Sequence, residues 1–145
     1  MKKIIVTLLT AVSMMMIFLP LANAAMFVLY NDNKTGDGAP VDLSKLTINE
    51  FKTWSCDIDV SDNSTTAVSV AISGNQCDPS HCSQSRLNKY SPMAMALYSM
   101  NISELAAGFA SFSIVDMPVQ RIRASVVALS GGTNPYVTVR CTGVR

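Results

Sequence analysis

The 145-residue sequence has few of the residues on which enzyme chemistry depends. It contains a single histidine, His81, and charged side chains make up only 14% of the chain. Every histidine-based catalytic mechanism would therefore have to use His81. The sequence motifs G-x-S-x-G of serine hydrolases and H-E-x-x-H of zinc proteases are absent, as is a glycine loop for phosphate. We therefore expect no catalytic residue and a protein that is not an enzyme.

The sequence also lacks an excess of positive charge. Its formal net charge is +1, which becomes −1 if the two lysines near the start are removed. Because nucleic acids and anionic membranes attract strongly basic surfaces, we expect neither as a partner. The charges are unevenly spread, with eight acidic and three basic residues in 25–85 but two acidic and six basic residues in 86–145. Such a division can be neutralised within one fold or between subunits.

Only one apolar run is long, and it lies at the start. Lys2 and Lys3 precede an uncharged stretch over 4–19, and Ala22-Asn23-Ala24 forms a small-x-small site. This pattern predicts a cleaved signal peptide over 1–24 of a bacterial type, and hence a periplasmic or extracellular protein. The alternative is an uncleaved anchor, for which the run is short. Residues 25–145 are then a single domain with no membrane span.

Strand patterns dominate the rest of the sequence. Residues 54–60 alternate between apolar and polar side chains, which is typical of a half-buried strand. Residues 67–73 are expected to return as its hairpin partner, and 102–108 to form a short helix that ends at Gly108. Further strands are expected over 26–30, 93–100, 109–115, 121–129 and 136–142. The spacing favours an all-β fold: a small antiparallel β-sandwich of Ig-like architecture, with about seven strands and one short helical crossover.

The four cysteines lie after the predicted cleavage point, and their even number favours two disulfides in an oxidising compartment. Cys56 and Cys141 both fall on the apolar faces of predicted strands. If these strands are antiparallel neighbours with the two cysteines opposite, both faces match in one register. The pairs are then Ile58 with Val139 and Val60 with Val137 inside, and Asp57 with Arg140 outside. A bridge between facing sheets would suit the same positions. Either arrangement predicts Cys56–Cys141, which leaves Cys77 to pair with Cys82.

The segment CDPSHC, residues 77–82, contains the densest group of reactive side chains. A zinc site needs four ligands, and a second Cys/His pair is missing. A redox motif normally has two residues between its cysteines, whereas four lie between these. The enclosed residues are Asp78, Pro79, Ser80 and His81. We interpret them as an exposed loop closed by a disulfide, on which a binding contact can form.

Met93 and Met95 suggest an alternative site. Residues i and i+2 of a strand project from the same face, and thioethers select Cu(I), with His81 as a further ligand upstream. Methionine is equally an ordinary core residue. Copper is therefore the alternative cofactor, and the favoured prediction is none.

The sequence thus predicts an exported, non-enzymatic module with a binding or structural role, either alone or as a subunit of a surface assembly. Its partner would be another protein or a second copy, for example through an N-terminal strand that pairs with a neighbouring chain. The alternatives are a periplasmic copper carrier and a secreted effector or inhibitor that binds a protein.

Overall fold

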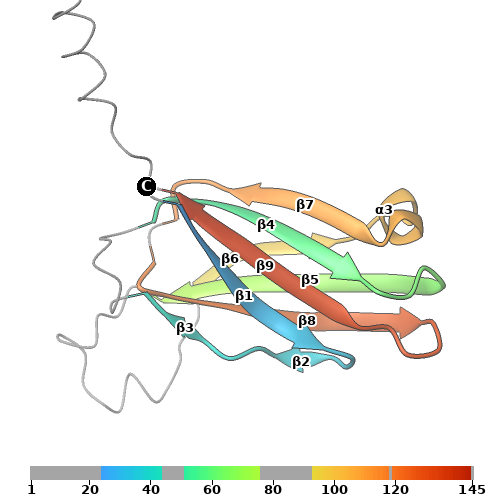
Figure 1. Cartoon of the computed structure of the whole chain (residues 1–145). Coiled ribbons are helices and arrows are strands. Elements are labelled where there is room, and N and C mark those ends of the chain that lie inside the picture. Colours follow the sequence, from blue (N-terminus) through green and yellow to red (C-terminus); the bar gives the residue numbers. More distant parts are fainter. Residues whose placement is uncertain (1–23, 44–50, 76–92, 118, 145) are drawn as a thin grey trace, which may run out of the picture.

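A computed structural model describes residues 24–43, 51–75, 93–117 and 119–144. In these residues nine strands form two antiparallel sheets packed face to face, and one helix connects two of the strands (Figure 1). The predicted all-β sandwich is therefore confirmed. The helix is much too short to cross a membrane, and the described residues contain no candidate membrane-spanning helix.

The first sheet has four strands, in the order β1 (Ala24–Asp32), β9 (Val137–Val144), β4 (Thr53–Val60) and β7 (Phe109–Ile114). The second has the order β2 (Gly36–Asp37), β8 (Arg121–Gly131), β5 (Thr65–Asn75) and β6 (Met93–Ser99), and β3 (Val41–Asp42) also pairs with β8. The two-residue strands β2 and β3 are additional to the predicted set of about seven. The helix α3 (Ile102–Ala107) joins β6 to β7 and therefore forms the predicted crossover between the sheets.

The predicted hairpin of residues 54–60 with residues 67–73 is wrong. β4 and β5 follow each other in sequence but lie in different sheets, and β5 pairs with β6 and β8 instead. Both strands bury one apolar face, and the two faces meet across the core, where Ile58 and Val68 are almost fully buried. An alternating pattern identifies the buried face of a strand, but it does not identify the neighbouring strand.

The register predicted from the cysteines is confirmed. β4 and β9 are antiparallel neighbours, and Cys56 lies opposite Cys141 with a Cα–Cα distance of 4.0 Å and a disulfide between them. The flanking inward pairs are Ile58 with Val139 and Val60 with Val137. Both cysteines are fully buried, so the bridge forms part of the core. Cys77 and Cys82 lie outside the described residues.

Acidic residues of the first half of the sequence form ion pairs with arginines of the second half within the same chain. Asp42 lies 3.4 Å from Arg121, Asp37 lies 2.9 Å from Arg123, and Asp59 lies 2.7 Å from Arg140. Each of these ion pairs joins an acidic residue of the first half to an arginine of the second half. The charge division therefore needs no second subunit to neutralise these three pairs.

The partner of Arg140 differs from the one predicted. Asp57 lies opposite Arg140 in the β4–β9 register, as expected, but the guanidinium pairs with Asp59, the diagonal neighbour. Asp57 instead accepts a hydrogen bond of 2.8 Å from the hydroxyl of Ser111 on β7. A long arginine side chain reaches diagonal positions on a sheet, so the residue directly opposite does not determine the ion pair.

Candidate functional site

The two sides of the sandwich differ in how their edge strands are covered. On one side, the segment that links β2 to β3 runs along β1. The amide of Gly38 donates to the carbonyl of Ala124 at 2.9 Å, and a side chain at Gly38 would meet the carbonyl oxygen of Leu29. Residues 28–32 and 37–41 together line a cavity of about 350 Å³. The chain itself therefore covers this part of the β1 edge.

On the other side, β6 and β7 end their sheets. Among the described residues β6 pairs only with β5, and β7 pairs only with β4. The ring of Tyr98 on β6 stacks on that of Phe112 on β7, with centroids 4.7 Å apart and planes 7° apart. This stack closes the core between the two edge strands. We call residues 93–99 and 109–115 the open side of the sandwich.

The open side carries no charge. The sequences of β6 (MAMALYS) and β7 (FASFSI) contain no charged residue and no proline. Natural edge strands commonly carry lysine, proline or an inward charge, because their free backbone groups would otherwise pair with another chain. Large apolar side chains are also exposed here: Leu97 at 71%, Val115 at 61% and Phe109 at 47%. These features make the open side the best candidate for an interaction surface.

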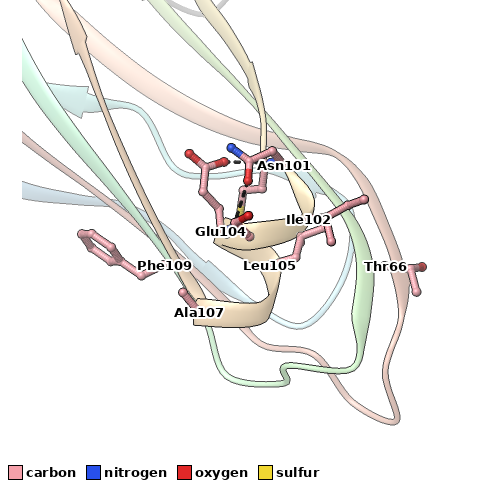
Figure 2. Close-up of a pocket in the computed structure, with 9 residues that line it drawn as sticks. Thr66, Asn101, Ile102, Glu104, Leu105, Ala107 and Phe109 are labelled. Atoms are coloured by element: carbon pink, nitrogen blue, oxygen red, sulfur yellow. Dashed lines mark hydrogen bonds between the residues drawn. The ribbon is translucent and has the colours of Figure 1, made fainter.

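The helix α3 connects β6 to β7 at one end of the open side and borders a hollow of about 680 Å³ (Figure 2). The side chain of Asn101 caps the helix by accepting from the Glu104 amide at 3.0 Å, while Glu104 accepts from the Asn101 amide at 2.8 Å. The Tyr98 hydroxyl donates to the other oxygen of Glu104 at 2.5 Å. The hydrogen bond from Tyr98, followed by that from the Asn101 amide, lowers the pKa of Glu104 below its ordinary value. The carboxylate therefore serves to hold α3 to β6.

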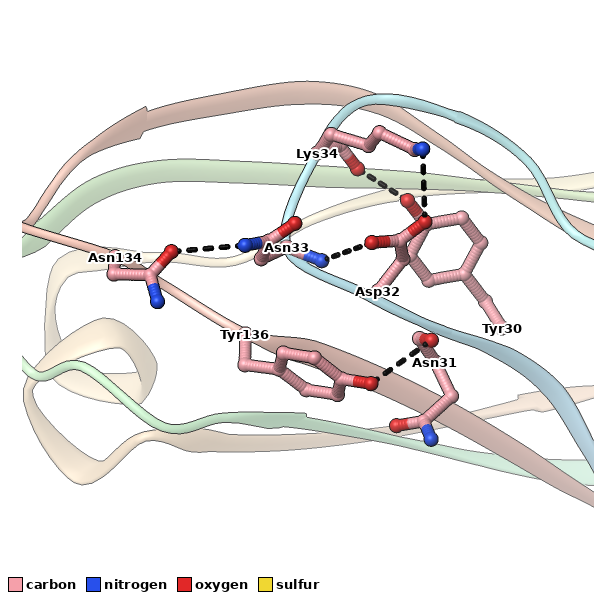
Figure 3. Close-up of polar contacts among 7 residues, drawn as sticks. All are labelled: Tyr30, Asn31, Asp32, Asn33, Lys34, Asn134 and Tyr136. Carbon is pink, nitrogen blue, oxygen red and sulfur yellow. Dashed lines mark hydrogen bonds and ion pairs between the residues drawn. The ribbon is translucent and has the colours of Figure 1, made fainter.

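Polar side chains gather at the turn that follows β1 (Figure 3). Asn33 donates through its side-chain amide to the side chain of Asn134 at 2.9 Å, and the Tyr136 hydroxyl donates to the carbonyl of Asn31 at 3.2 Å. The Tyr30 hydroxyl donates to the carbonyl of Lys34. These bonds join the turn after β1 to the turn between β8 and β9, so we interpret the cluster as structural.

Asp62 joins a second pair of turns. Its carboxylate accepts from the amide and hydroxyl of Ser64 at 2.9 and 2.5 Å, and from the amide of Thr133 at 2.8 Å. The hydrogen bonds from Ser64, followed by that from Thr133, lower the pKa of Asp62 to about 2. The ionised carboxylate therefore holds the β4–β5 turn against the β8–β9 turn.

The two methionines of the copper hypothesis differ in how far their side chains are exposed to solvent. Met93 is 40% exposed, whereas Met95 is 9% exposed, with its sulfur close to Gly74. The pairing of β6 with β5 contains a bulge at Met95, because Ala94 and Ala96 pair with adjacent residues of β5. A bulge interrupts the alternation of side chains, so the same-face argument for the M-x-M pair does not hold across it.

The remaining predicted site residues, Asp78, Pro79, Ser80 and His81, lie outside the described residues. Within the described ranges there is no group of three or more histidine, cysteine, aspartate or glutamate side chains placed to hold a metal ion. The sequence alone did not single out the open side. The lack of charge in β6 and β7 is visible in the sequence, but their position at the sheet edges is not.

No model of a protein family and no curated protein sequence matches this chain. Solved structures do resemble it. The SPBc2 prophage-derived protein YomS aligns over 88% of this chain and 97% of its own, with 12% identity and a TM-score of 0.47. The PBSX exported protein XepA aligns over 88% of this chain and 39% of its own, with 10% identity and a TM-score of 0.45.

Proposed function

We propose that this chain is an exported, non-enzymatic β-sandwich module that binds protein, either alone or as a subunit of a surface assembly. The observation that carries the proposal is the open side, where two edge strands without charge or proline lie next to each other. An exposed sheet edge binds an extended segment of another chain through backbone hydrogen bonds, and neighbouring side chains add selectivity.

The exposed apolar residues support the same function. Leu97 projects from the edge strand of one sheet, while in the other sheet Phe109 begins β7 and Val115 directly follows its last residue. A partner that covers both edges would remove these side chains from water, which is favourable by about 25 cal/mol per Å² of apolar surface.

The disulfide supports export. Disulfides form and persist in oxidising compartments such as the periplasm and the extracellular space. The Cys56–Cys141 bridge joins two central strands and is fully buried, so it belongs to the core. Together with the predicted signal peptide, this favours a periplasmic or extracellular protein.

Photo-crosslinking in the producing cells tests the binding surface. A photoreactive residue is placed in the full chain at Leu97 or at Ser113, both exposed on the open side, or at Val127 as a control. Val127 is 53% exposed on β8, away from β6 and β7. We expect protein adducts from positions 97 and 113 that exceed those from 127. Equal yields at the three positions would refute the open side as the binding surface.

The effector or inhibitor hypothesis places the contact elsewhere, on the loop over 77–82. A fourth crosslinking position, Ser80, separates the two hypotheses. If the chain binds its partner through that loop, adducts form from position 80 and not from positions 97 and 113.

A further inference from the structure

The edge strand β7 is complementary to itself. In an antiparallel pair, opposite residues share a face, so two copies of one strand match faces when the pairing is centred on a residue. Centred on Phe112, the pairing places Ser111 opposite the partner's Ser113 and Phe109 opposite the partner's Val115, all on the outer face. On the inner face it places Phe112 opposite the partner's Phe112 and Ala110 opposite the partner's Ile114.

Both faces therefore match in one register. The outer face has two hydroxyl pairs between exposed serines, flanked by pairs of an aromatic with a β-branched side chain, which stabilise neighbouring strands. Phe109 and Val115, which are about half or more exposed in one copy, would cover each other. The inner face extends the apolar core that the Tyr98–Phe112 stack closes in a single copy.

From this register we propose that two copies of the chain associate through β7, antiparallel, so that their four-stranded sheets join into one continuous sheet of eight strands. The inference rests on the proposed function and names the partner at the open side. The arrangement has a two-fold axis through the Phe112 pair and uses the same surface on both copies. It is therefore closed, and it yields a dimer and not a fibre.

Two other edge strands, β6 and β1, fit a second copy less well. β6 contains the bulge at Met95, which breaks the regular alternation that a strand needs to pair with its own copy. β1 has a bulge near Leu29, and the segment after β2 covers its edge there. β7, in contrast, pairs with β4 over six consecutive residues without a register shift.

The absence of charge favours a second copy over another protein. In a symmetric pair of strands, every pair of opposite residues away from the centre occurs twice. Two like charges placed opposite each other would therefore repel at two places. β7 has no charged residue, and it therefore has no barrier of this kind against its own copy. An interface adapted to a different protein commonly uses charges to exclude wrong partners.

Two variants that share one substitution test the register. In Ser111→Lys/Ser113→Lys, each new lysine faces a lysine of the other copy. In Ser111→Lys/Ser113→Glu, each lysine faces a glutamate. Both serines are exposed, and a lysine at position 111 would lie beside Asp57, so the single copy should tolerate either change. The control Val127→Lys/Ser130→Lys adds two lysines at exposed positions of β8.

Sedimentation velocity over a range of concentrations measures association, and circular dichroism verifies that each variant is folded. We expect dimers for the wild type, for the control and for the lysine–glutamate variant, whose dimer should weaken as salt is raised. The dissociation constant of the lysine–lysine dimer should be roughly tenfold higher than that of the wild type, or more. A monomeric wild type, or a lysine–lysine variant that dimerises like the wild type, would overturn the proposal. Loss of the dimer in both variants would overturn the register.

The crosslinker at Ser113 provides a test that does not depend on charged variants. We expect an adduct of twice the chain mass, in which peptides from β7 of two copies are joined. An adduct with a different protein at positions 97 and 113 would overturn the dimer and leave the proposed function intact. Equal yields at positions 97, 113 and 127 would refute both.

Discussion

Cys56 and Cys141 lie directly opposite each other on β4 and β9, and a disulfide joins them across 85 positions of the sequence. These strands are the two central ones of their sheet, because β1 and β7 flank them. The bridge therefore lies in the middle of the core, where it links β4 to the last strand of the domain. Its removal should act on the stability of the whole sandwich.

We expect Cys56→Ala/Cys141→Ala to lower the free energy of unfolding by about 2–5 kcal/mol, because a bridge that closes a long loop restricts the unfolded chain. Urea denaturation of the purified domain measures this change. Cys77→Ala/Cys82→Ala is the matched comparison, with a loss of only about 2 kcal/mol because its loop is short. An equal or larger loss in the second variant would contradict the prediction. Non-reducing peptide mapping checks the pairing directly, and a Cys56–Cys77 peptide would exclude it.

Asp62 should make stability depend on pH. Its pKa is lowered to about 2 in the folded chain from an ordinary value of 3.8, so the ionised form is favoured by folding. The resulting stabilisation is complete above pH 3.8 and is lost as the pH falls toward 2. Asp62→Asn should therefore lower Tm at neutral pH, and the difference from wild type should shrink as the pH falls below 3.8 and through 2.

The control for this effect is Asp116→Asn. It also removes one carboxylate, at a position with a positive φ of 57° that asparagine adopts readily. We expect its Tm difference from wild type to be small at neutral pH. If Asp62→Asn and Asp116→Asn gave the same pH profile, the hydrogen bonds to Asp62 would not be the cause.

The cap of α3 should matter for the crossover between the sheets. Asn101→Ala removes the side-chain acceptor of the Glu104 amide and should cost about 0.5–2 kcal/mol of stability. Asn101→Asp keeps an oxygen at this position and should be close to neutral. Chemical denaturation of both variants measures the difference. Similar losses in the two would indicate that the acceptor oxygen is not what stabilises this region.

Gly74 should resist enlargement. A Cβ at this position would lie 2.3 Å from Cγ1 of Val119 and 2.6 Å from the sulfur of Met95, both buried. Gly74→Ala should therefore destabilise the fold by about 1–3 kcal/mol through overpacking. The same change should cost less in a Val119→Ala background, because the two residues are coupled by the clash. Equal costs in the two backgrounds would contradict this explanation.

The copper-carrier hypothesis makes a separate prediction. If Met93 and Met95 bound Cu(I), the variant Met93→Leu/Met95→Leu would lose a stoichiometric binding step in a Cu(I) titration. We expect the wild type and the variant to titrate alike, because Met95 is buried beside Gly74 and a bulge separates it from the exposed Met93. Loss of one equivalent of copper in the variant would favour the carrier instead.

Much of the fold could be predicted from local patterns. Alternation over residues 54–60 identified the buried face of β4, and the cysteines then identified its register with β9. Gly108 marked the end of α3, which it caps with a positive φ of 71°. The alternation and the helix end depend on residues that are close in sequence, and the register depends on one disulfide between distant cysteines. Both kinds of feature can be recognised in a single sequence.

Apart from the pairing of β4 with β9, only the tertiary structure decided which strands are neighbours. β4 and β5 have compatible patterns and a short turn, yet they belong to different sheets, because burying both apolar faces against each other closes the core. The ion pair of Arg140 goes to Asp59 because the long arginine side chain reaches the diagonal position. The edge positions of β6 and β7 follow from the strand order. The sequence by itself determined which faces of β4 and β9 are buried. The packing of two sheets determined which strands were left at the edges, and these edges are the surface on which we expect this protein to act.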